Sequence, residues 1–313
     1  IRGKGFNLPE EQLHWEIYDL LGYGGLTPEI VEYLMGLLTT TPEGAKKSEF
    51  RPVELFQRLE DFYLRWCEGE FIDDLAGEML AQKKTRKLKE QEIQLGQRQV
   101  DVYAGLNVMI LLLELHRYAL SRDELKDKIA FYPCGKYGTE DFDQTRLLYM
   151  INYSDCIGIG GFLKTVGKFL NGVDLSGAKL SGADLSGVDF RDAQLIRTDF
   201  IGANISRANF AGADLTDAYV SRADFSRTNL IGANLVGANL IGANLIGANL
   251  IGANLSNADL SGANLSRADL SNTDCTEIIW DEYTQWKNIR GWKKTVNVPD
   301  TLWASWDNNQ NLV

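Results

Sequence analysis

One periodicity limits what this chain can fold into: a large apolar residue stands at every fifth position from residue 175 onward. A small residue, usually Ala, lies two positions before each of them, and Asp or Asn commonly separates the pair. The stretch from Ile231 to Leu255 repeats this pattern almost perfectly, as IGANL VGANL IGANL IGANL IGANL. The 21 consecutive positions are Leu175, Leu180, Leu185, Phe190, Leu195, Phe200, Ile205, Phe210, Leu215, Val220, Phe225, Leu230, Leu235, Leu240, Leu245, Leu250, Leu255, Leu260, Leu265, Leu270 and Cys275.

This period of five excludes both common regular structures, because an α-helix repeats about every 3.6 residues and a strand about every two. The chain must instead turn a corner once per repeat, so that the same two side chains always return to the inside. Four repeats form the four sides of one coil, and each residue then lies over its equivalent four repeats later. The interior is narrow, so a side chain much larger than Ala at the small position would overfill it.

The large residues of the repeat are therefore expected to form a continuous buried core. Phe190 and Phe210 are four repeats apart and should stack, whereas Phe200 and Phe225 belong to other sides of the coil. At about 4.8 Å between coils, 21 repeats make about five coils and a rod about 25 Å long. The structural core that we predict includes Leu175, Phe190, Phe200, Phe210, Phe225, Leu235 and Leu255.

The pattern Ala-(Asp/Asn)-Leu-x-x, most regular in residues 231–255, resembles the pentapeptide-repeat proteins. The resemblance covers about a third of the chain, and it implies a right-handed quadrilateral β-helix with the Leu and Ala positions inward. The fold class expected for the whole chain is an α + β solenoid. An all-α domain in residues 1–170 would come first, then the β-helix in residues 171–275, then a Trp-rich cap in residues 276–313.

A solenoid must cover its two open ends, because an exposed coil presents unpaired backbone groups and an apolar interior. We expect Trp280, Trp286 and Trp292 to cap the last coil. The alternative is that they form a contact between two copies of the chain, since aromatic residues are favoured at interfaces. A monomer and a homodimer both stay open. The tryptophans that follow the last repeat, five of the seven in the chain, are Trp280, Trp286, Trp292, Trp303 and Trp306.

The N-terminal part of the chain has the patterns of helices. Pro9 opens one that ends at Gly22, and Arg51-Pro52 precedes an amphipathic one. A long apolar helix is predicted over about 97–120, and shorter ones near 121–130, 140–153 and 161–170. This region would also cover the first coil. Together with the segment that ends at Trp286, it resembles parts of cyanobacterial proteins with such repeats, which implies a cyanobacterial source.

The composition favours a cytoplasmic protein. The formal net charge is −11, which opposes non-specific attachment to nucleic acid or to anionic lipid. No stretch approaches the roughly 18–20 apolar residues that span a bilayer, so we expect no membrane contact. The four cysteines form no Cys-x-x-Cys pair and read as reduced thiols. The N-terminus has no apolar signal core, and it starts at Ile1 rather than Met, which is consistent with removal of upstream residues.

No arrangement of catalytic residues is evident in the sequence. The two histidines, His14 and His116, each lie in a predicted helix without a patterned Cys, Ser or carboxylate partner. The segment from Gly161 to Lys168 fails as a phosphate loop, because the required first Gly is Phe162 and the hydroxyl residue after Lys168 is missing. A dense basic run in residues 83–89 lacks aromatic neighbours and reads as a solvated helix or loop. We therefore predict no catalytic residue, no cofactor and no metal.

The best candidate for a partner-binding surface is a set of apolar residues that directly follow the large position of the repeat. Most repeats carry a polar residue there, often Ser, but five in succession carry Ile or Val. β-branched residues can also serve strand propensity alone, and their distribution over all four sides argues against one contiguous patch. The candidate residues are Ile231, Val236, Ile241, Ile246 and Ile251.

The resemblance also suggests a specific alternative, because some pentapeptide-repeat proteins are thought to mimic duplex DNA and to bind a type II topoisomerase. Residues 171–275 contain eleven Asp against six Arg and one Lys, a net charge of −4. Duplex DNA carries one charge per about 1.7 Å, or roughly 15 over the expected length of the rod. This comparison disfavours DNA mimicry.

The sequence thus predicts a non-enzymatic scaffold or regulator whose rigid rod binds a protein partner and no nucleic acid. DNA mimicry is the first alternative, and an enzyme with a site in the helical domain is the second.

Overall fold

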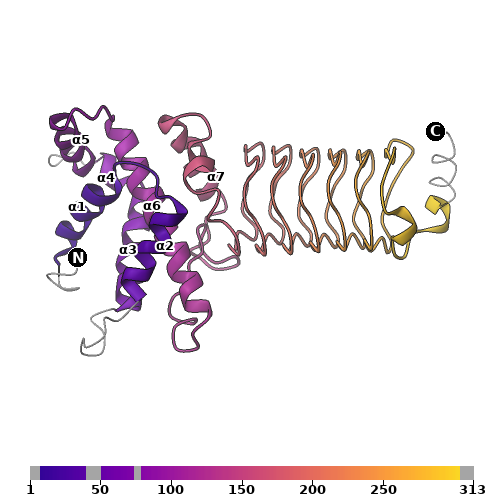
Figure 1. Cartoon of the computed structure of the whole chain (residues 1–313), viewed down its shortest axis with the longest axis horizontal. Helices are drawn as coiled ribbons and strands as arrows, with labels where there is room; N and C mark the ends of the chain where they lie inside the picture. Colours follow the sequence, from indigo (N-terminus) through magenta and orange to yellow (C-terminus); the bar gives the residue numbers. More distant parts are fainter. Residues whose placement is uncertain (1–7, 40–50, 74–78, 304–313) are drawn as a thin grey trace. The chain divides into compact units, whose positions relative to one another are not determined.

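Each five-residue repeat folds as a turn followed by a short extended segment, and the extended segments of neighbouring coils pair in parallel (Figure 1). The structure, a computed structural model, describes residues 8–39, 51–73 and 79–303. Parallel bridges join positions four repeats apart, from Asp174 with Gln194 to Asp259 with Ile279. The chain turns a corner after each short extended segment. The described coils therefore contain one β-bridge on each side instead of continuous strands. The repeats therefore build a β-solenoid.

The interior of the coil is filled by the large and the small residue of each repeat. The large residues from Leu175 to Cys275 are at most 1% exposed, as is the small residue in most repeats. The rings of Phe190 and Phe210 lie 5.2 Å apart between centroids, and Phe210 also approaches Phe200 at 6.3 Å and Phe225 at 6.0 Å. The four rings thus form one cluster inside neighbouring coils.

Threonine replaces Ala at some small positions without leaving its hydroxyl unsatisfied. Thr198 donates to the carbonyl oxygen of Leu175 at 2.9 Å, and Thr228 donates to that of Ile205 at 3.1 Å. Both threonines are 0% exposed. A buried hydroxyl is tolerated here because each corner offers a carbonyl of the preceding coil.

The Asp or Asn of each repeat stabilises the corner that follows it. Its side-chain oxygen accepts the backbone N–H two residues later, as Asp174 does from Ser176 at 3.0 Å. Several Asn amides also donate to the residue in the preceding coil, as Asn204 does to Asp184 at 3.0 Å. These residues act as side-chain turns, a role for which Asp and Asn have the right length.

The coil continues past Cys275, the last position of the regular repeat. The bridges from Asn264 to Gln285 and from Asp269 to Arg290 each enclose one residue more than the regular bridges do, and the next, from Asp274 to Val296, encloses two more. Residues 276–296 therefore form a further, less regular coil, which includes the 3₁₀ helix η3 (Trp292–Lys294). Trp306 lies outside the described residues.

The first coil finds backbone partners in the segment that precedes it. In later coils the bridge residue donates its N–H to the coil before, as Asp199 does to Ala178. Lys179 has no earlier coil and donates instead to the carbonyl of Gln144, at 2.7 Å. Accordingly, residues 132–149 form one compact unit with residues 170–303, which we call the coil unit. The helical domain expected in residues 1–170 would have included residues 132–149.

The helical unit comprises the described residues up to 131 and residues 150–169. Its central helix, α6 (Gln97–Leu120), is buried on nearly every side and packs against α1, α3 and α5. Gly105 of α6 allows the ring of Trp66 to lie directly on the helix backbone, where a Cβ would come within 2.0 Å of the ring. The other helices are α1 (Glu10–Leu21), α2 (Pro28–Thr39), α3 (Pro52–Cys67), α4 (Glu70–Asp73), α5 (Leu80–Glu90), η2 (Ser154–Ile157) and α8 (Gly161–Thr165), and α7 (Arg146–Tyr153) crosses the boundary between the units.

The helix predicted near 121–130 is wrong, because the chain there forms a series of turns. Arg122 and Leu125 accept the backbone bonds of these turns, and the charged residues between them offer no apolar stripe for a helix to bury. The last two predicted helices are shorter than expected and correspond to α7 and α8. Within the described ranges, none of the helices has both the length and the apolar character that crossing a bilayer requires.

Candidate functional site

The helical unit holds one group of side chains with metal-ligand chemistry. Glu10 and His14 of α1 and Asp61 of α3 place their ligand atoms within 4.8 Å of one another. His14 is buried against the rings of Phe62 and Phe71, and burial lowers its pKa, so the imidazole is neutral.

A cation is already present at this group. The guanidinium of Arg65 forms an ion pair with Glu10 and lies 3.5 Å from Asp61. A metal ion would have to displace this guanidinium before it could share the two carboxylates. The arrangement therefore fits an arginine-bridged pair of helices better than a metal site.

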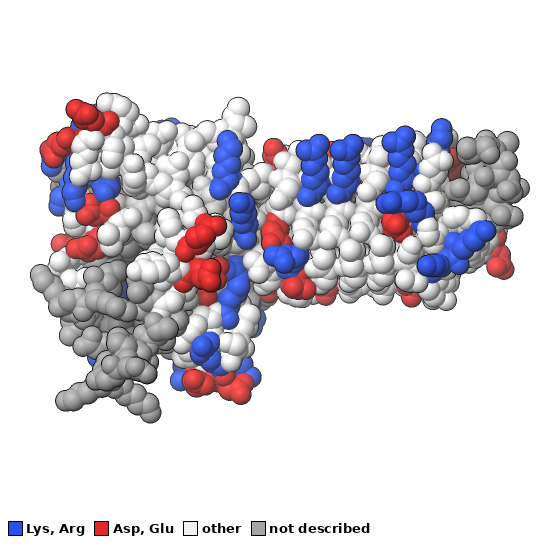
Figure 2. Space-filling view, in the orientation of Figure 1, with Lys and Arg blue, Asp and Glu red and all other residues white. Residues whose placement is uncertain are grey.

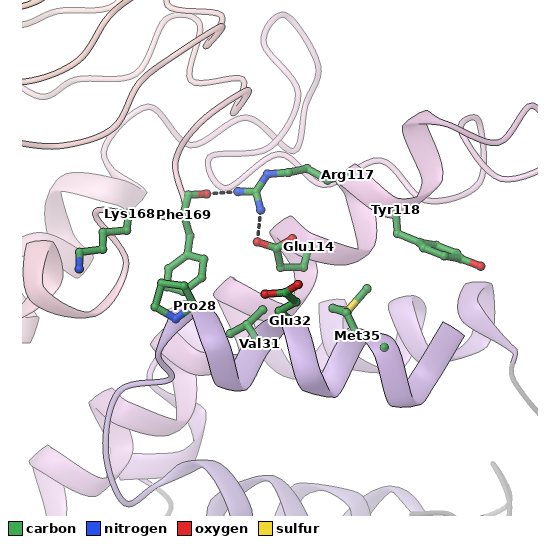
Figure 3. A pocket seen from close by; sticks show the side chains of 10 residues that line it. Pro28, Val31, Glu32, Met35, Glu114, Arg117, Tyr118, Lys168 and Phe169 are labelled. Atoms are coloured by element: carbon green, nitrogen blue, oxygen red, sulfur yellow. Dashed lines mark hydrogen bonds and ion pairs between the residues drawn. The ribbon is translucent and has the colours of Figure 1, made fainter. Parts of the chain in front are cut away.

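The helical unit also contains a cavity of about 590 Å³ beside α2 and α6 (Figure 3). Val31, Met35 and Phe169 supply apolar walls. The guanidinium of Arg117 points at the carboxylate of Glu114 and at the carbonyl oxygen of Phe169 and donates to both (Figure 3). Arg117 and Glu114 thus satisfy each other, and the described residues that line the cavity include no Ser, Thr or Cys.

The basic run of residues 83–89 lies in α5, where Lys84 is buried and Lys83, Arg86 and Lys89 are exposed. Lys84 is only 6% exposed, and its ammonium lies 3.0 Å from a carboxylate oxygen of Asp19. Lys87 binds the same carboxylate at 2.7 Å, and the ammonium of Lys83 lies 4.2 Å from the ring centre of Trp15. These contacts dock α5 on α1 and give Lys83, Lys84 and Lys87 a structural role.

The coil unit carries the predicted apolar residues on its surface, but it does not gather them into one patch. Ile231, Ile241 and Ile246 are 42%, 41% and 36% exposed, and Val236 and Ile251 are half-buried. They occupy successive corners of a single coil, and only Ile231 and Ile251 share a corner. A partner on one side of the coil can therefore contact one or two of them.

Ile246 differs from the others because it lines a groove of about 610 Å³. The groove crosses neighbouring coils at one corner, where the backbone N–H of Arg207 donates to Ser226 and that of Arg227 donates to Ile246. Figure 2 shows Lys and Arg side chains in a row along one edge of the repeats. The groove is lined by Ser186, Gly187, Asn204, Ser206, Arg207, Ser226, Arg227 and Ile246.

The arginines and two further exposed apolar residues of the regular repeats were not predicted from the sequence pattern. Arg207 and Arg227 were counted only as charges that offset the Asp residues, although their spacing of four repeats places them at the same corner. Ile201, 43% exposed, and Tyr219, 47% exposed, stand outside the run of five consecutive apolar repeats. Sorting the outward residues by their position within each coil would have found all of them.

At the C-terminal end, Trp286 is buried, whereas Trp280 and Trp292 are half-buried. The ring of Trp292 lies 5.4 Å from that of Trp303. Ile278 and Ile289 are also buried in this last coil, at 6% and 4% exposed. The tryptophans thus occupy different environments, and one of the predicted three is fully enclosed.

Comparison with known proteins concerns the coil. A family model of pentapeptide repeats matches residues 170–207, 208–245 and 238–274, with eight copies. The solved structure of a pentapeptide repeat protein, Rfr23, from the cyanobacterium Cyanothece is 30% identical, and the match covers 40% of this chain and 94% of that one, with a TM-score of 0.30. No curated protein matches the sequence.

Two further solved structures are similar to part of the chain. A pentapeptide repeat protein from the thylakoid lumen of Arabidopsis thaliana is 36% identical, over 33% of this chain and 69% of that one, with a TM-score of 0.27. HetL, a pentapeptide repeat protein involved in heterocyst differentiation regulation in the cyanobacterium Nostoc, is 28% identical, over 40% and 63%, with a TM-score of 0.19.

Proposed function

The chain belongs to the pentapeptide-repeat family, and we propose that it is a non-enzymatic scaffold or regulator whose coil binds a protein partner. The observation that carries this proposal is the exposure of Ile241 and Ile246 on a coil whose backbone polar groups pair with one another. Apolar side chains on a rigid surface can bind without a large loss of conformational entropy, because the backbone beneath them is already ordered.

Pentapeptide repeats form a right-handed β-helix. We propose the finer form as well: a quadrilateral coil of 21 repeats closed by a cap that includes Trp280, Trp286 and Trp292. The parallel bridges between positions four repeats apart support four sides per coil, and the burial of Trp286 supports the cap. A homodimer through Trp280 or Trp292 is the competing arrangement, and the mass of the full chain in solution would distinguish the two.

The alternative of DNA mimicry is weakened by what the Asp residues do. Most of them cap the corners of the coil, so their presence has a structural reason. Arginines interleave with them, and Arg191 and Arg197 pair with Asp189 and Asp217. We expect the purified protein to leave DNA supercoiling by gyrase unchanged.

We also propose that the protein works in the cytoplasm without a catalytic site. The four cysteines form no disulfide in the part of the chain that the structure describes, which is the pattern of a protein from a reducing compartment. In the helical unit, the pairing of Arg65 and of Arg117 with carboxylates supports a structural role for the polar clusters. Turnover lost on a change of Glu114 or His14 would revive the enzyme alternative.

The test is a comparison of proteins captured from an extract of the native organism by full-length variants. Ile241→Glu combined with Ile246→Glu should lose a partner that the wild type retains, because each Glu would bury a charge at the contact. Ser261→Glu combined with Ser266→Glu is the matched control, since it adds the same charge at the same corners one coil away. If the Ile variant retains every protein that the wild type captures, the apolar surface is not the binding site.

A further inference from the structure

Several arginines of the coil adopt a backbone conformation that normally favours glycine. The second turn residue has a positive φ in every regular repeat, and Gly fills it most often, as at Gly247 with φ 67°. Arg207 and Arg227 each have φ 59°, and Arg267 has φ 64°. A left-handed conformation disfavours a residue with a Cβ. Backbone strain of this kind at a surface position calls for a reason.

An ion pair within the chain can explain the positive φ of some of these arginines but not of others. Arg197, also at positive φ, lies 3.5 Å from the carboxylate of Asp217. Among the described residues, by contrast, no carboxylate lies within 4.0 Å of the guanidinium of Arg207, Arg227 or Arg267. All three side chains are exposed. The fold therefore gains no ion pair in return for the strained conformation at these three positions.

The three arginines stand at one corner of the coil. Arg207 and Arg227 are one coil apart, at about 4.8 Å, and Arg267 lies two coils further, about 10 Å away. Gly247 occupies the same corner in the coil between Arg227 and Arg267. It leaves room for the aliphatic part of the Arg227 side chain, because a Cβ at position 247 would lie 3.8 Å from the Cγ of Arg227. The result is a line of positive charge along one edge of an acidic chain (Figure 2).

The groove beside this line adds hydroxyl and apolar groups. Ser206 and Ser226 line it with Arg207 and Arg227, and Ile246 adds an apolar side chain. Guanidinium groups bind carboxylates through two parallel hydrogen bonds, and serine hydroxyls add single ones. An extended segment places alternate side chains on one face about 7 Å apart, a spacing that flexible arginines one to two coils apart can follow.

We propose that this corner binds an acidic segment of a protein partner, with its carboxylates on Arg207, Arg227 and Arg267 and an apolar residue against Ile246. The inference names the partner chemistry for the proposed scaffold function and rests on it. A nucleic acid is the less suitable occupant, because its phosphates would extend along a chain whose net charge is −11. A protein segment brings its negative charge only to the corner.

The experiment measures binding to the full chain, by anisotropy, of a fluorescent decapeptide in which Glu residues and one Leu occupy alternate positions, with Ser between them, so that Glu and Leu share one face. Arg207→Gly combined with Arg227→Gly should weaken binding about tenfold or more, and added salt should weaken the wild-type complex. Glycine suits the positive φ, so this variant should melt no lower than the wild type. The control, Arg191→Gly with Arg197→Gly, removes the same charge from other corners and should bind within about twofold of the wild type.

Three results would overturn the inference. The first is equal affinity of the wild type and the Arg207→Gly/Arg227→Gly variant, and the second is no binding of the peptide to the wild type. The third is tighter binding of a short duplex DNA than of the peptide through the same arginines. The wild type could fail to bind the peptide while the Ile241→Glu/Ile246→Glu variant still loses a captured partner. In that case the proposal of an acidic ligand at the arginine corner is wrong, and the proposed scaffold function is unaffected.

Discussion

The side chains inside the coil explain why the period is so strict. Each large residue is enclosed by the coils above and below, and each small residue leaves space for its neighbours. Phe210 is the clearest case, because it lies against Phe190, Phe200 and Phe225. A residue that deviates in size must therefore leave a cavity or displace a neighbouring ring.

Phe210→Ala should destabilise the coil unit by about 3–5 kcal/mol, because the cavity would be shared by three rings and could not collapse easily. Phe210→Leu, which introduces the residue that most repeats carry, should cost about 1–2 kcal/mol. Denaturant unfolding of the full chain followed by circular dichroism measures both. Equal stability of the Ala variant and the wild type would contradict close packing of the ring cluster.

The buried thiols predict a loss of stability at high pH. Burial raises the pKa of Cys275 to about 12, whereas an unfolded thiol ionises at about 9. Below pH 9 the thiol is protonated in both states and has no effect on the pH dependence. As the pH rises from about 9 to 12 only the unfolded state loses the proton, so the free energy of unfolding falls.

Cys275→Val keeps an apolar side chain at this position and should make the decline between pH 9 and 12 shallower. The measurement is the free energy of unfolding at several values of pH, for both proteins. Cys156 is half-buried, so Cys156→Ala serves as the comparison and should change the decline less. Identical slopes for the wild type and Cys275→Val would show that the buried thiol does not contribute.

Sequence alone predicted which positions face the interior, because the period of five admits no other assignment. It could not predict the structural roles of the residues that depart from the repeat, such as Thr at the small position or Arg at the second turn position. Thr228 appeared only as a small residue, and its bond to the carbonyl of Ile205 depends on where the preceding coil places that oxygen. The strain at Arg207 was also hidden, since a positive φ is a property of the turn and not of the residue type.

At the scale of elements, the helical unit is organised around α6 and one buried carboxylate. Asp101 of α6 accepts hydrogen bonds from the hydroxyl of Tyr18, from the indole of Trp66 at 3.0 Å and from the hydroxyl of Tyr153 at 3.2 Å. These donors belong to α1, α3 and α7. The carboxylate thereby joins four helices, and burial beside it holds the pKa of Tyr18 well above its usual value.

Asp101→Asn should lower the free energy of unfolding of the helical unit by about 2–4 kcal/mol. The amide NH2 would replace one of the two acceptor oxygens, and the loss of charge would weaken the hydrogen bonds that remain. Thermal melting monitored at a helical wavelength is the measurement. Asp123→Asn, at a side chain that is 95% exposed, should change the stability by no more than about 0.5 kcal/mol. A similarly small effect at Asp101 would contradict its structural role.

Elements were predictable where a periodic apolar pattern was long, and less so elsewhere. The prediction of a buried helix over 97–120 agrees with α6 because its apolar residues surround the helix. The helix predicted near 121–130 does not form, because its charged residues favour a helix by propensity but provide no apolar face that could pack against the rest of the unit. The further coil in residues 276–296 escaped notice because one or two inserted residues break the period, although its bridges continue the solenoid.

At the scale of the whole molecule, the chain combines a coil that satisfies its own backbone with a helical unit whose polar clusters pair internally. The coil carries the two surfaces that we propose for binding: the apolar corners at Ile241 and Ile246, and the arginine corner. The helical unit also exposes single apolar side chains, such as Ile159 and Tyr33. The small net charge of the repeats and the corner role of their Asp residues favour a surface for proteins over a copy of duplex DNA.

If binding resides in the coil unit, variants of the coil and of the helical unit should differ in the proteins that they capture. Proteins captured by full-length wild type from an extract of the native organism are compared with those captured by two variants. One variant carries Ile241→Glu and Ile246→Glu. The other reverses two exposed charges at the helical cavity, with Glu32→Lys and Lys168→Glu.

We predict that the coil variant loses a partner that the wild type and the cavity variant both retain, in amounts measured by quantitative mass spectrometry. Circular dichroism of both variants serves as the check that each chain is folded. Loss of the partner from the cavity variant alone, with full retention by the coil variant, would contradict the claim and place the binding function in the helical unit.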